Sequence, residues 1–412
     1  MTGFTFLHAA DLHLGAPFRG LGRRGTPEDA ARLAAAPFAA FRRIAELARR
    51  EKAAFLLLAG DIFDSREFSL ASLAEFRKTL ELLGDAGIPV FAVAGNHDYL
   101  PWPDAFEAPE NFRLFPAGTA AAETVRIGGE AVATVAGISH GCAAEKRDLV
   151  PQLAEALRDA PGFRIALLHA NIGGAPGFEP YAPAPLSELL DSGAADYWAL
   201  GHVHTPAILA REPAAAVYPG SAQGRSVIET GARCARLVRV GADRRIEIEA
   251  HPVDEIRFEV VSVEAPAEAG NLSRLRELLK EAARRAADGA PGEVLLRVVL
   301  RGATPLNDAR RREDPEELHR LCAALLPSGC RLESVRIATA APLSAARREG
   351  LAAEVEAVRG ALPGELREYL ASLRLSSRTF GDFSDEELET IAADAADLLI
   401  DRLAGGGGGG EA

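Results

Sequence analysis

Five apolar segments of this 412-residue sequence end in side chains that can bind metals or transfer protons. Each segment reads as a buried strand, because it is short, apolar and followed by a turn signal. Carboxylate, imidazole and amide groups therefore recur where a strand gives way to a loop, and open α/β sheets place their chemistry at such strand ends. The eight side chains are Asp11, His13, Asp61, Asn96, His97, His169, His202 and His204.

This set of side chains favours hard or borderline divalent cations. Carboxylate, imidazole and amide ligands without a thiolate suit manganese, iron or zinc, and they differ from the ligands of a structural zinc cage. A single His or Asp at a strand end is more often a turn residue. Eight such groups exceed the needs of one ion. Two ions about 3.5–4 Å apart that share one carboxylate would use them to polarise a phosphoryl group and to make hydroxide from water.

The elements that must position these groups alternate between strands and helices, which predicts parallel, buried strands. In the first part of the chain we expect strands at about 4–10, 54–59 and 89–94, separated by helices at about 28–52 and 70–86. Later strands are expected near 124–127, 131–138, 163–168, 197–200, 235–240 and 246–250, with a helix near 146–158. The Pro- and Gly-rich segment 173–185 reads as a surface loop or active-site rim.

The sequence divides into four parts. Residues 1–253 contain all the strand-end groups and form the predicted catalytic domain. Residues 254–340 read as a small β-α-β-α-β unit. Residues 341–404 have the apolar spacing of amphipathic helices, and a capping box at Ser384 opens the last of them. Residues 405–412 are a glycine-rich tail with no expected structure.

Composition limits the function classes. The net charge of −13 argues against a protein that binds nucleic acid by bulk electrostatics, so DNA binding would need a local basic patch or a partner. Arg19, Arg23 and Arg24 are candidates for such a patch, whereas the arginines of the first long helix read as a solvated face. Apolar stretches fall short of the roughly 20 residues of a membrane helix. We therefore expect no membrane contact, a cytoplasmic location and reduced cysteines.

The ordered motifs resemble those of the calcineurin-like metallophosphoesterases. The matching segments are Asp11-x-His13, Gly60-Asp61-x-x-Asp64, Gly95-Asn96-His97-Asp98, His169 and Gly201-His202-x-His204. Within that superfamily, the segments 7–15 and 218–225 look most like the SbcD-type DNA repair exonuclease family, in particular its YhaO-like bacterial branch. The resemblance implies an α/β fold in which helices flank a β-sandwich, followed by a small α+β capping domain and a C-terminal helical region.

The resemblance also implies a role for each strand-end group. One ion would be held by Asp11, His13, Asp61 and His204, and the other by Asp61, Asn96, His169 and His202, so that Asp61 bridges the two. His97 would face the scissile phosphate as a general acid, and Asp64 would orient the His97 imidazole. Manganese is the expected metal, with magnesium, iron and zinc as alternatives.

The implied function is cleavage of DNA in repair, as an exonuclease or endonuclease subunit that works with a coiled-coil, SMC-like ATPase. The helices of 341–404 would attach to this partner or pack on their own domain, and a homodimer is also left open. Candidate DNA contacts are Arg19, Arg23, Arg24 and Ser221. A metallophosphoesterase acting on small phosphodiesters or phosphomonoesters is the main alternative. An inactive scaffold is a third, which the complete set of ligands disfavours.

Several other polar side chains near the motifs read more simply as structural. We expect His8 to be a core histidine, Asp98 to anchor its own loop, and His140 to be a loop histidine without a special role. No base accompanies Ser221 in the sequence, so we do not expect a serine nucleophile.

Overall fold

The structure is a computed structural model that describes residues 2–16, 26–64, 69–99, 101–102, 106–264, 272–303 and 315–340. These residues form two compact units: the first comprises Met1–Glu259 and Ala287–Leu295, and the second comprises Val260–Ala286 and the described chain from Leu296 onward. The predicted domain boundary at residue 253 stays a prediction. The predicted helical arm 341–404, the tail 405–412, and the candidate contacts Arg19, Arg23 and Arg24 lie outside the described residues.

The first unit contains two six-stranded sheets. In one of them, β1 to β4 are parallel neighbours, and β11 pairs with β1 in the antiparallel direction. Its strands, in spatial order, are β12 (Ile246–Pro252), β11 (Cys234–Val240), β1 (Phe4–Ala9), β2 (Phe55–Ala59), β3 (Val90–Val93) and β4 (Phe112–Leu114). The parallel arrangement predicted for the first three strands is confirmed.

The second sheet has a parallel centre and antiparallel edges. Strands β6, β7, β8 and β10 are parallel neighbours, and β5 and β9 pair antiparallel at the two ends. Its strands, in spatial order, are β5 (Ala121–Ile127), β6 (Glu130–Ile138), β7 (Phe163–His169), β8 (Tyr197–Gly201), β10 (Ala215–Tyr218) and β9 (Ala207–Ala210).

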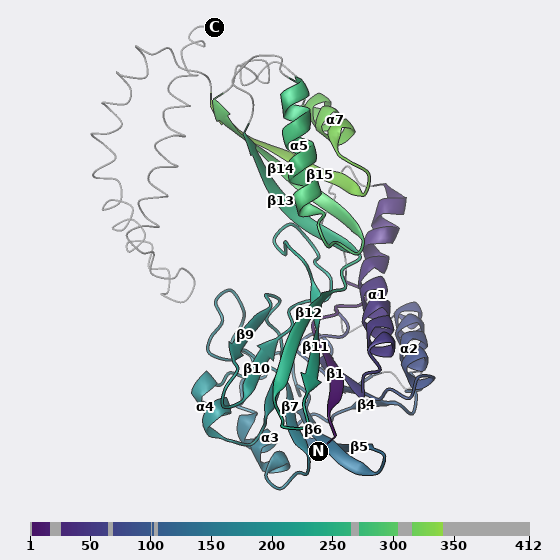
Figure 1. Ribbon diagram of the computed structural model, residues 1–412, viewed down its shortest axis with the longest axis vertical. Coiled ribbons are helices and arrows are strands. Elements are labelled where there is room, and N and C mark those ends of the chain that lie inside the picture. The colour runs from purple at the N-terminus through teal and green to yellow at the C-terminus, as the bar shows by residue number, and fades with distance from the viewer. Residues whose placement is uncertain are drawn as a thin grey trace, which may run out of the picture. The chain divides into compact units, whose positions relative to one another are not determined.

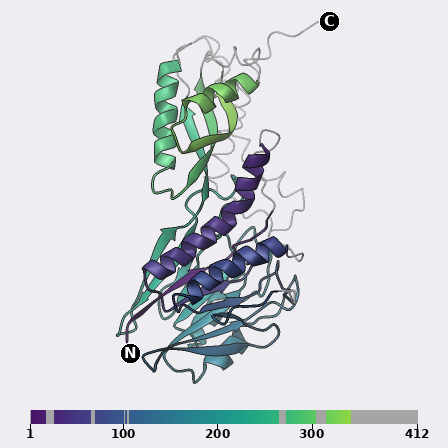
Figure 2. The same ribbon diagram turned by 90° about the vertical axis from the view of Figure 1, so that its right-hand side faces the viewer.

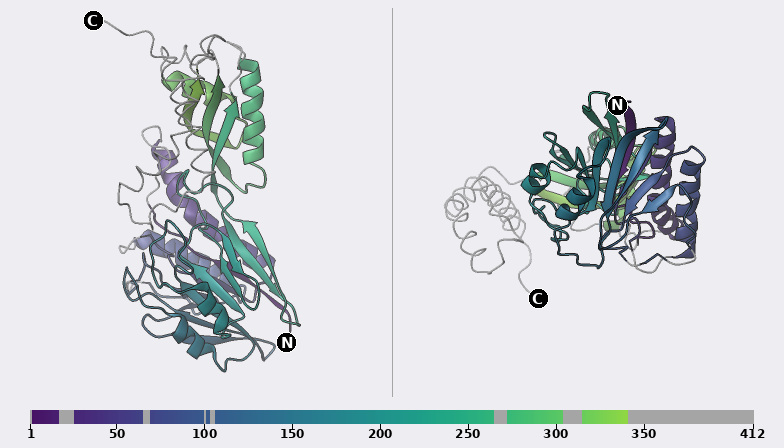
Figure 3. Two further views of the ribbon diagram at one scale, coloured as in Figure 1. Left: turned by 90° about the vertical axis from the view of Figure 1, so that its left-hand side faces the viewer. Right: turned by 90° about the horizontal axis from the view of Figure 1, so that it is seen from below.

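Helices cover the outer faces of both sheets. Helices α1 (Pro27–Arg50) and α2 (Leu70–Gly84) lie side by side (Figure 2) and share one apolar core with the first sheet. Helices α3 (Val150–Leu157) and α4 (Leu186–Asp191) pack on the second sheet. Between the sheets lies a core that includes Phe6 and Phe55, whose stacked rings are 5.0 Å apart. The unit is a layered α/β/β/α sandwich, seen from below in Figure 3.

Helix α1 begins at a capping box. The Thr26 side chain accepts a hydrogen bond from the Asp29 amide at 3.1 Å, and the Asp29 carboxylate accepts one from the Thr26 amide at 3.1 Å. A cap of this kind stabilises a helix by about 1 kcal/mol. Pro27, at the first helical position, supplies a preset φ angle without losing a needed hydrogen bond. These signals determine where α1, the helix that leads from β1 to β2, begins.

Four short elements were not expected from the sequence: β4, β9, β10 and α4. Each has six residues or fewer, too few to show a helical or alternating apolar period. The helix expected near 146–158 begins only at Val150, since the preceding segment is a loop in which Glu145 binds the Arg147 guanidinium at 2.7 Å.

The second unit has the predicted β-α-β-α-β order (Figure 1). Its sheet has the strand order β13-β14-β15, and one apolar core joins the helices to it, with Leu275, Val298 and Leu325 among its residues. The elements are β13 (Ile256–Glu264), α5 (Leu272–Ala286), β14 (Glu293–Ala303), α7 (Pro315–Leu325) and β15 (Cys330–Ala340). Among the helices that the structure describes, none has the length and apolar character needed to cross a bilayer.

Candidate active site

The carboxyl ends of β1, β2, β3, β7 and β8 meet at one site. Backbone hydrogen bonds continue past the strands, from the Asp11 amide to the Gly60 carbonyl at 3.1 Å and from the His13 amide to the Asp61 carbonyl at 3.0 Å. Asp11, His13, Asp61 and His202 have positive φ angles of 51°, 46°, 48° and 96°. Such a backbone costs a non-glycine residue roughly 1–3 kcal/mol and is typical of functional sites, where the surroundings hold it in place.

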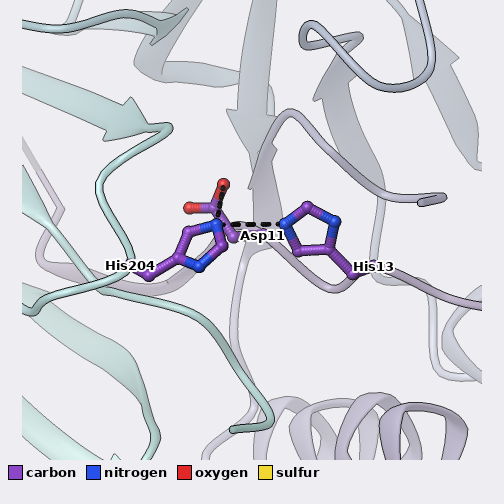
Figure 4. A group of neighbouring side chains, drawn as sticks. All are labelled: Asp11, His13 and His204. Carbon is purple, nitrogen blue, oxygen red and sulfur yellow. Dashed lines mark hydrogen bonds and ion pairs between the residues drawn. The ribbon is translucent and has the colours of Figure 1, made fainter. Parts of the chain in front are cut away.

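Asp11, His13 and His204 form a compact group of potential metal ligands. The Nε2 atoms of His13 and His204 are 3.1 Å apart, and His204 Nε2 is 3.9 Å from Asp11 Oδ1. Figure 4 shows the two rings directed toward each other, with the Asp11 carboxylate beside His204. Burial raises the pKa of Asp11 to about 6 and lowers the pKa of His13 to about 4. These residues are three of the four predicted ligands of one ion.

Asp61 lies at the centre of the site. Its Oδ2 atom is 3.4 Å from His169 Nε2 and 3.9 Å from the Nε2 atoms of both His13 and His97. Burial would raise the pKa of Asp61, but these three imidazoles lower it well below its usual range. Burial would conversely lower the pKa of His169, and the Asp61 charge raises it to about 9. A central carboxylate of this kind is what the predicted bridging role requires.

The other predicted ligands lie around His169. Asn96 Oδ1 is 3.0 Å from His169 Nε2, and the His202 ring centroid is 5.2 Å from that of His169. His169 donates from Nδ1 to the Ala59 carbonyl at 2.9 Å, and His202 donates from Nε2 to the Glu179 carbonyl at 2.8 Å. These bonds leave His169 Nε2 and His202 Nδ1 as the nitrogens that could bind an ion.

His97 is placed differently from the predicted ligands, since its side chain is 38% exposed. Its amide donates to Asp61 Oδ1 at 2.9 Å, and its Nδ1 donates to the backbone carbonyl of Asp64 at 2.9 Å. Nε2 is therefore the nitrogen that remains for a substrate. This geometry suits the general-acid role predicted for His97.

Asp64 acts on more than His97. The Asp64 backbone carbonyl accepts a hydrogen bond from His97 Nδ1, whereas the Asp64 carboxylate oxygen Oδ1 is 3.7 Å from His97 Nδ1 and 2.9 Å from His13 Nδ1. The role of Asp64 in orienting the His97 imidazole stays a prediction. The same oxygen accepts a hydrogen bond from Arg225 at 2.8 Å. The carboxylate is thus closer to a predicted metal ligand than to the predicted acid.

Three further residues contact predicted site residues. Glu229 Oε1 is 2.6 Å from His204 Nδ1, and Arg225 reaches Asp64. Neither role was predicted from the sequence. His140 is fully buried and donates from Nε2 to the His169 carbonyl at 2.6 Å. His140 does lie in a loop, as predicted, but the expectation that it has no special role is wrong, because it is buried and holds the His169 backbone carbonyl.

The remaining sequence predictions have mixed outcomes. His8 is completely buried, which confirms the core assignment. Asp98 accepts hydrogen bonds from the amides of Gly95 at 2.7 Å and Ile62 at 2.8 Å, which confirms that it anchors its loop. Ser221 is only 1% exposed. Its hydroxyl does not reach the surface, and the candidate DNA contact at Ser221 stays a prediction.

Two motif glycines have no room for a side chain. A Cβ atom at Gly95 would lie 2.3 Å from Asp61 Oδ1 and 2.8 Å from His169 Cδ2. A Cβ atom at Gly201 would lie 1.8 Å from the Ala59 carbonyl oxygen. Glycine at these positions allows the strand ends to approach each other closely enough to bring carboxylate and imidazole groups together.

We expect Gly95→Ala to displace Asp61 and His169 and to lower metal-dependent hydrolysis by roughly 100-fold, the order of effect of a 1 Å displacement in an active site. Rates and metal affinity of the purified variant check this. The matched control is Gly141→Ala, because a Cβ there has its nearest neighbours at 3.8 and 3.9 Å, in ordinary contact. Wild-type rates in Gly95→Ala would show that the site tolerates the displacement.

The donor set fits two divalent cations. His13, His169, His202 and His204 each have one ring nitrogen beside a carboxylate or a backbone carbonyl, which leaves the other for a metal. Three overlapping triads of potential ligand atoms lie within 4.8 Å, and two of them contain Asp61. Carboxylate and imidazole groups without a thiolate suit manganese, iron, zinc or magnesium. The arrangement suggests a dimetal site.

Comparison with known proteins identifies the family. Residues 4–206 match the family Calcineurin-like phosphoesterase, and residues 257–340 match the middle domain of the metallophosphoesterase YhaO. The Bacillus subtilis (strain 168) protein named Uncharacterized metallophosphoesterase YhaO is 35% identical over 311 residues, which are 74% of this chain and 73% of that protein.

Two archaeal relatives are each named DNA double-strand break repair protein Mre11. The protein from Aeropyrum pernix is 31% identical over 52% of this chain and 52% of its own length. The protein from Archaeoglobus fulgidus is 28% identical over 53% of this chain and 50% of its own length. The fold class expected from the sequence is confirmed, and the chain belongs to the calcineurin-like metallophosphoesterase family, with a YhaO-type middle domain.

Proposed function

We propose that the protein is a two-metal-dependent phosphodiesterase that cleaves DNA, as an exonuclease or endonuclease of cytoplasmic DNA repair, with manganese as its working metal. The observation that carries the proposal is the position of His97, a partly exposed imidazole beside the largely buried carboxylates and imidazoles that could hold metal ions. The choice of DNA is supported by the similarity to the two Mre11 proteins, whose names assign them to double-strand break repair.

The chain's own residues divide the work of hydrolysis. The bound ions would polarise the phosphoryl group and supply hydroxide near neutral pH. His97, held through Nδ1 on the Asp64 carbonyl, would donate a proton from Nε2 to the leaving oxygen when it is protonated at both nitrogens. The Asp61 carboxylate fixes the His97 backbone through the amide hydrogen bond at 2.9 Å, so that the acid keeps a fixed position relative to the proposed bridging group.

We further propose a coiled-coil, SMC-like ATPase as partner. A chain with a net charge of −13 has little electrostatic attraction for DNA, so a partner that binds DNA would supply the affinity. Co-expression of the chain with a candidate ATPase, followed by DNA-binding measurements, tests this. DNA affinity should rise in the complex, and an unchanged affinity would remove the reason for the partner.

The purified protein is expected to cleave linear DNA with Mn²⁺ and to lose all detectable cleavage when a chelator removes the metal, because the predicted site depends on its ions for the nucleophile. The measurement compares linear DNA, a chromogenic phosphodiester and a chromogenic phosphomonoester under the same conditions. Restoring Mn²⁺ after chelation is the control, since it should restore cleavage and thereby exclude irreversible unfolding.

The same comparison separates the proposal from its alternative. Cleavage of the chromogenic diester or monoester, with DNA left intact even in the presence of an ATPase partner, would favour a metallophosphoesterase of small phosphodiesters or phosphomonoesters. The name of the Bacillus subtilis relative specifies a metallophosphoesterase and no substrate, so it agrees with either outcome.

A further inference from the structure

A charged bridge lies behind the group formed by Asp11, His13 and His204. Glu229 Oε1 is 2.6 Å from the Nδ1 atom of His204. Its other oxygen, Oε2, accepts a hydrogen bond from the Arg225 amide at 2.8 Å. Both the Glu229 and the His204 side chains are largely buried, at 15% and 17% exposure, so this pair is shielded from water. The contact therefore differs from a solvated surface ion pair.

Arg225 connects this carboxylate to a second one. Its Nη1 donates to Asp64 Oδ1 at 2.8 Å, and its Nη2 is 3.9 Å from Glu229 Oε1. Asp64 Oδ1 in turn lies 2.9 Å from His13 Nδ1. The series His204, Glu229, Arg225, Asp64 and His13 thus joins two imidazoles whose Nε2 atoms are 3.1 Å apart.

The support of these imidazoles differs from that of the other two predicted histidine ligands. His169 and His202 have their second nitrogen on the backbone carbonyls of Ala59 and Glu179, which are neutral. His13 and His204 have theirs beside carboxylates. A carboxylate behind a ligating imidazole fixes its tautomer and its ring orientation and raises its basicity, which strengthens metal binding. The two ion positions are therefore supported by different chemistry.

We propose that Glu229, Arg225 and Asp64 form a carboxylate–guanidinium–carboxylate bridge that selectively sets the metal affinity of the position formed by Asp11, His13 and His204. Glu229 and Arg225 are positioning residues, because they act on the ion only through the two histidines. The position held by Asn96, His169 and His202 is independent of the bridge. The inference depends on the dimetal site and not on DNA as the substrate.

The low pKa of Glu229 agrees with this bridge. Burial would raise the pKa of the Glu229 carboxyl, but the His204 imidazole and the Arg225 amide and guanidinium lower it to about 2.

The test is calorimetric titration of the metal-free full-length protein with Mn²⁺. The wild type is expected to bind two ions. Glu229→Ala should weaken one of them by roughly 10–100-fold, the usual effect of losing the partner of a ligating histidine, and leave the other unchanged. Glu229→Gln, which keeps an acceptor for His204 Nδ1 without the charge, should show a smaller loss at the same position. In the wild type, electron paramagnetic resonance should show spin-coupled Mn²⁺ pairs. In Glu229→Ala, one equivalent of Mn²⁺ should give the signal of a single, uncoupled Mn²⁺ ion.

Two further variants test the bridge as a unit. Arg225→Gln should weaken the same position, and the double variant with Glu229→Ala should lose less than the product of the two single losses, since the residues share one network. Ile228→Ser is the matched control, because Ile228 is 90% exposed on the same loop. It should bind both ions with wild-type affinity.

Three results would overturn the proposal: unchanged affinities in Glu229→Ala, an equal loss at both ion positions, or the same loss in Ile228→Ser, which would assign the effect to the loop as a whole. If Glu229→Ala fails to fold, Glu229→Gln carries the test alone. The readout is ion binding. A protein that binds two ions but leaves DNA intact would therefore refute DNA as the substrate, and this inference would still stand.

Discussion

Replacing His97 with alanine is expected to lower the rate of DNA cleavage by roughly 10²–10⁴-fold, the usual contribution of a general acid, while both metal ions still bind. His97 Nε2 is the one nitrogen of that ring left free by the contact with the Asp64 carbonyl. The side chain is 38% exposed, in contrast to the buried predicted ligands His13 and His169, so it can meet a phosphodiester without entering the metal site. Single-turnover cleavage of linear DNA and calorimetric titration with Mn²⁺ measure the two properties separately.

The control for this variant is His251→Ala. His251 lies on β12, where its Nε2 is 3.1 Å from the Glu249 carboxylate, away from the strand ends that form the site. It should cleave at the wild-type rate. If His97→Ala cleaves DNA undiminished, the acid has been assigned to the wrong residue. If it loses a metal ion as well as activity, His97 is a ligand, as its place in a triad with His13 and Asp61 would also permit.

That the predicted ligands lie close together could be inferred from the sequence, because buried parallel strands leave a clear signature. The run 55–59 is entirely buried in the structure, and Asp61 follows it after a single glycine. His169 is likewise the last residue of a strand whose final residues are all buried. Parallel strands bring these ends to the same edge, so the order of motifs along the chain was enough to bring the ligands together.

The partners of those ligands could not be predicted in the same way. The contact of Glu229 with His204 joins two loops, and no period of apolar residues marks either position. Whether the Asp64 carboxylate lies closer to His13 or to His97 depends on the orientation of these two rings, which are 4.9 Å apart and nearly perpendicular to each other. Distances of this scale are set by side-chain rotamers and by the left-handed backbone at His13, and residue spacing does not encode them.

Burial was the other property that the sequence left undetermined. Ser221 and His140 both occupy short polar segments that read as exposed loops. In the structure Ser221 forms an isolated bridge with Ala10, and His140 lies against His169 with its ring fully buried. Burial lowers the pKa of His140 to about 4, so it is neutral at pH 7 and serves to hold the His169 backbone. Its position supports a ligand without adding a charge to the site.

Asp61→Asn is expected to abolish binding of both metal ions together with all hydrolysis. The Asp61 carboxylate has imidazoles from both predicted ligand sets close to it, with Oδ2 3.4 Å from His169 Nε2 and 3.9 Å from His13 Nε2. The amide keeps the shape and the acceptor for the His97 amide, so the fold should survive while the charge is lost. The affinity for each ion should fall by more than the roughly 10–100-fold expected from removing a carboxylate that only positions a ligand.

Metal-linked stability gives a measurement that does not depend on activity. An ion that binds only the folded protein stabilises it by about 3 kcal/mol at a free concentration of about 100 times its Kd, so Mn²⁺ should raise the melting temperature of the wild type. Mn²⁺ should leave the melting temperature of Asp61→Asn unchanged, whereas it should raise that of the exposed control Asp159→Asn as it does for the wild type.

Because the pKa of His169 is raised to about 9 by Asp61, Mn²⁺ binding to the wild type at neutral pH should also release a proton. If Asp61→Asn still binds one ion with wild-type affinity, Asp61 is a ligand of only one ion. Another group would then have to be the ligand shared by the two ions.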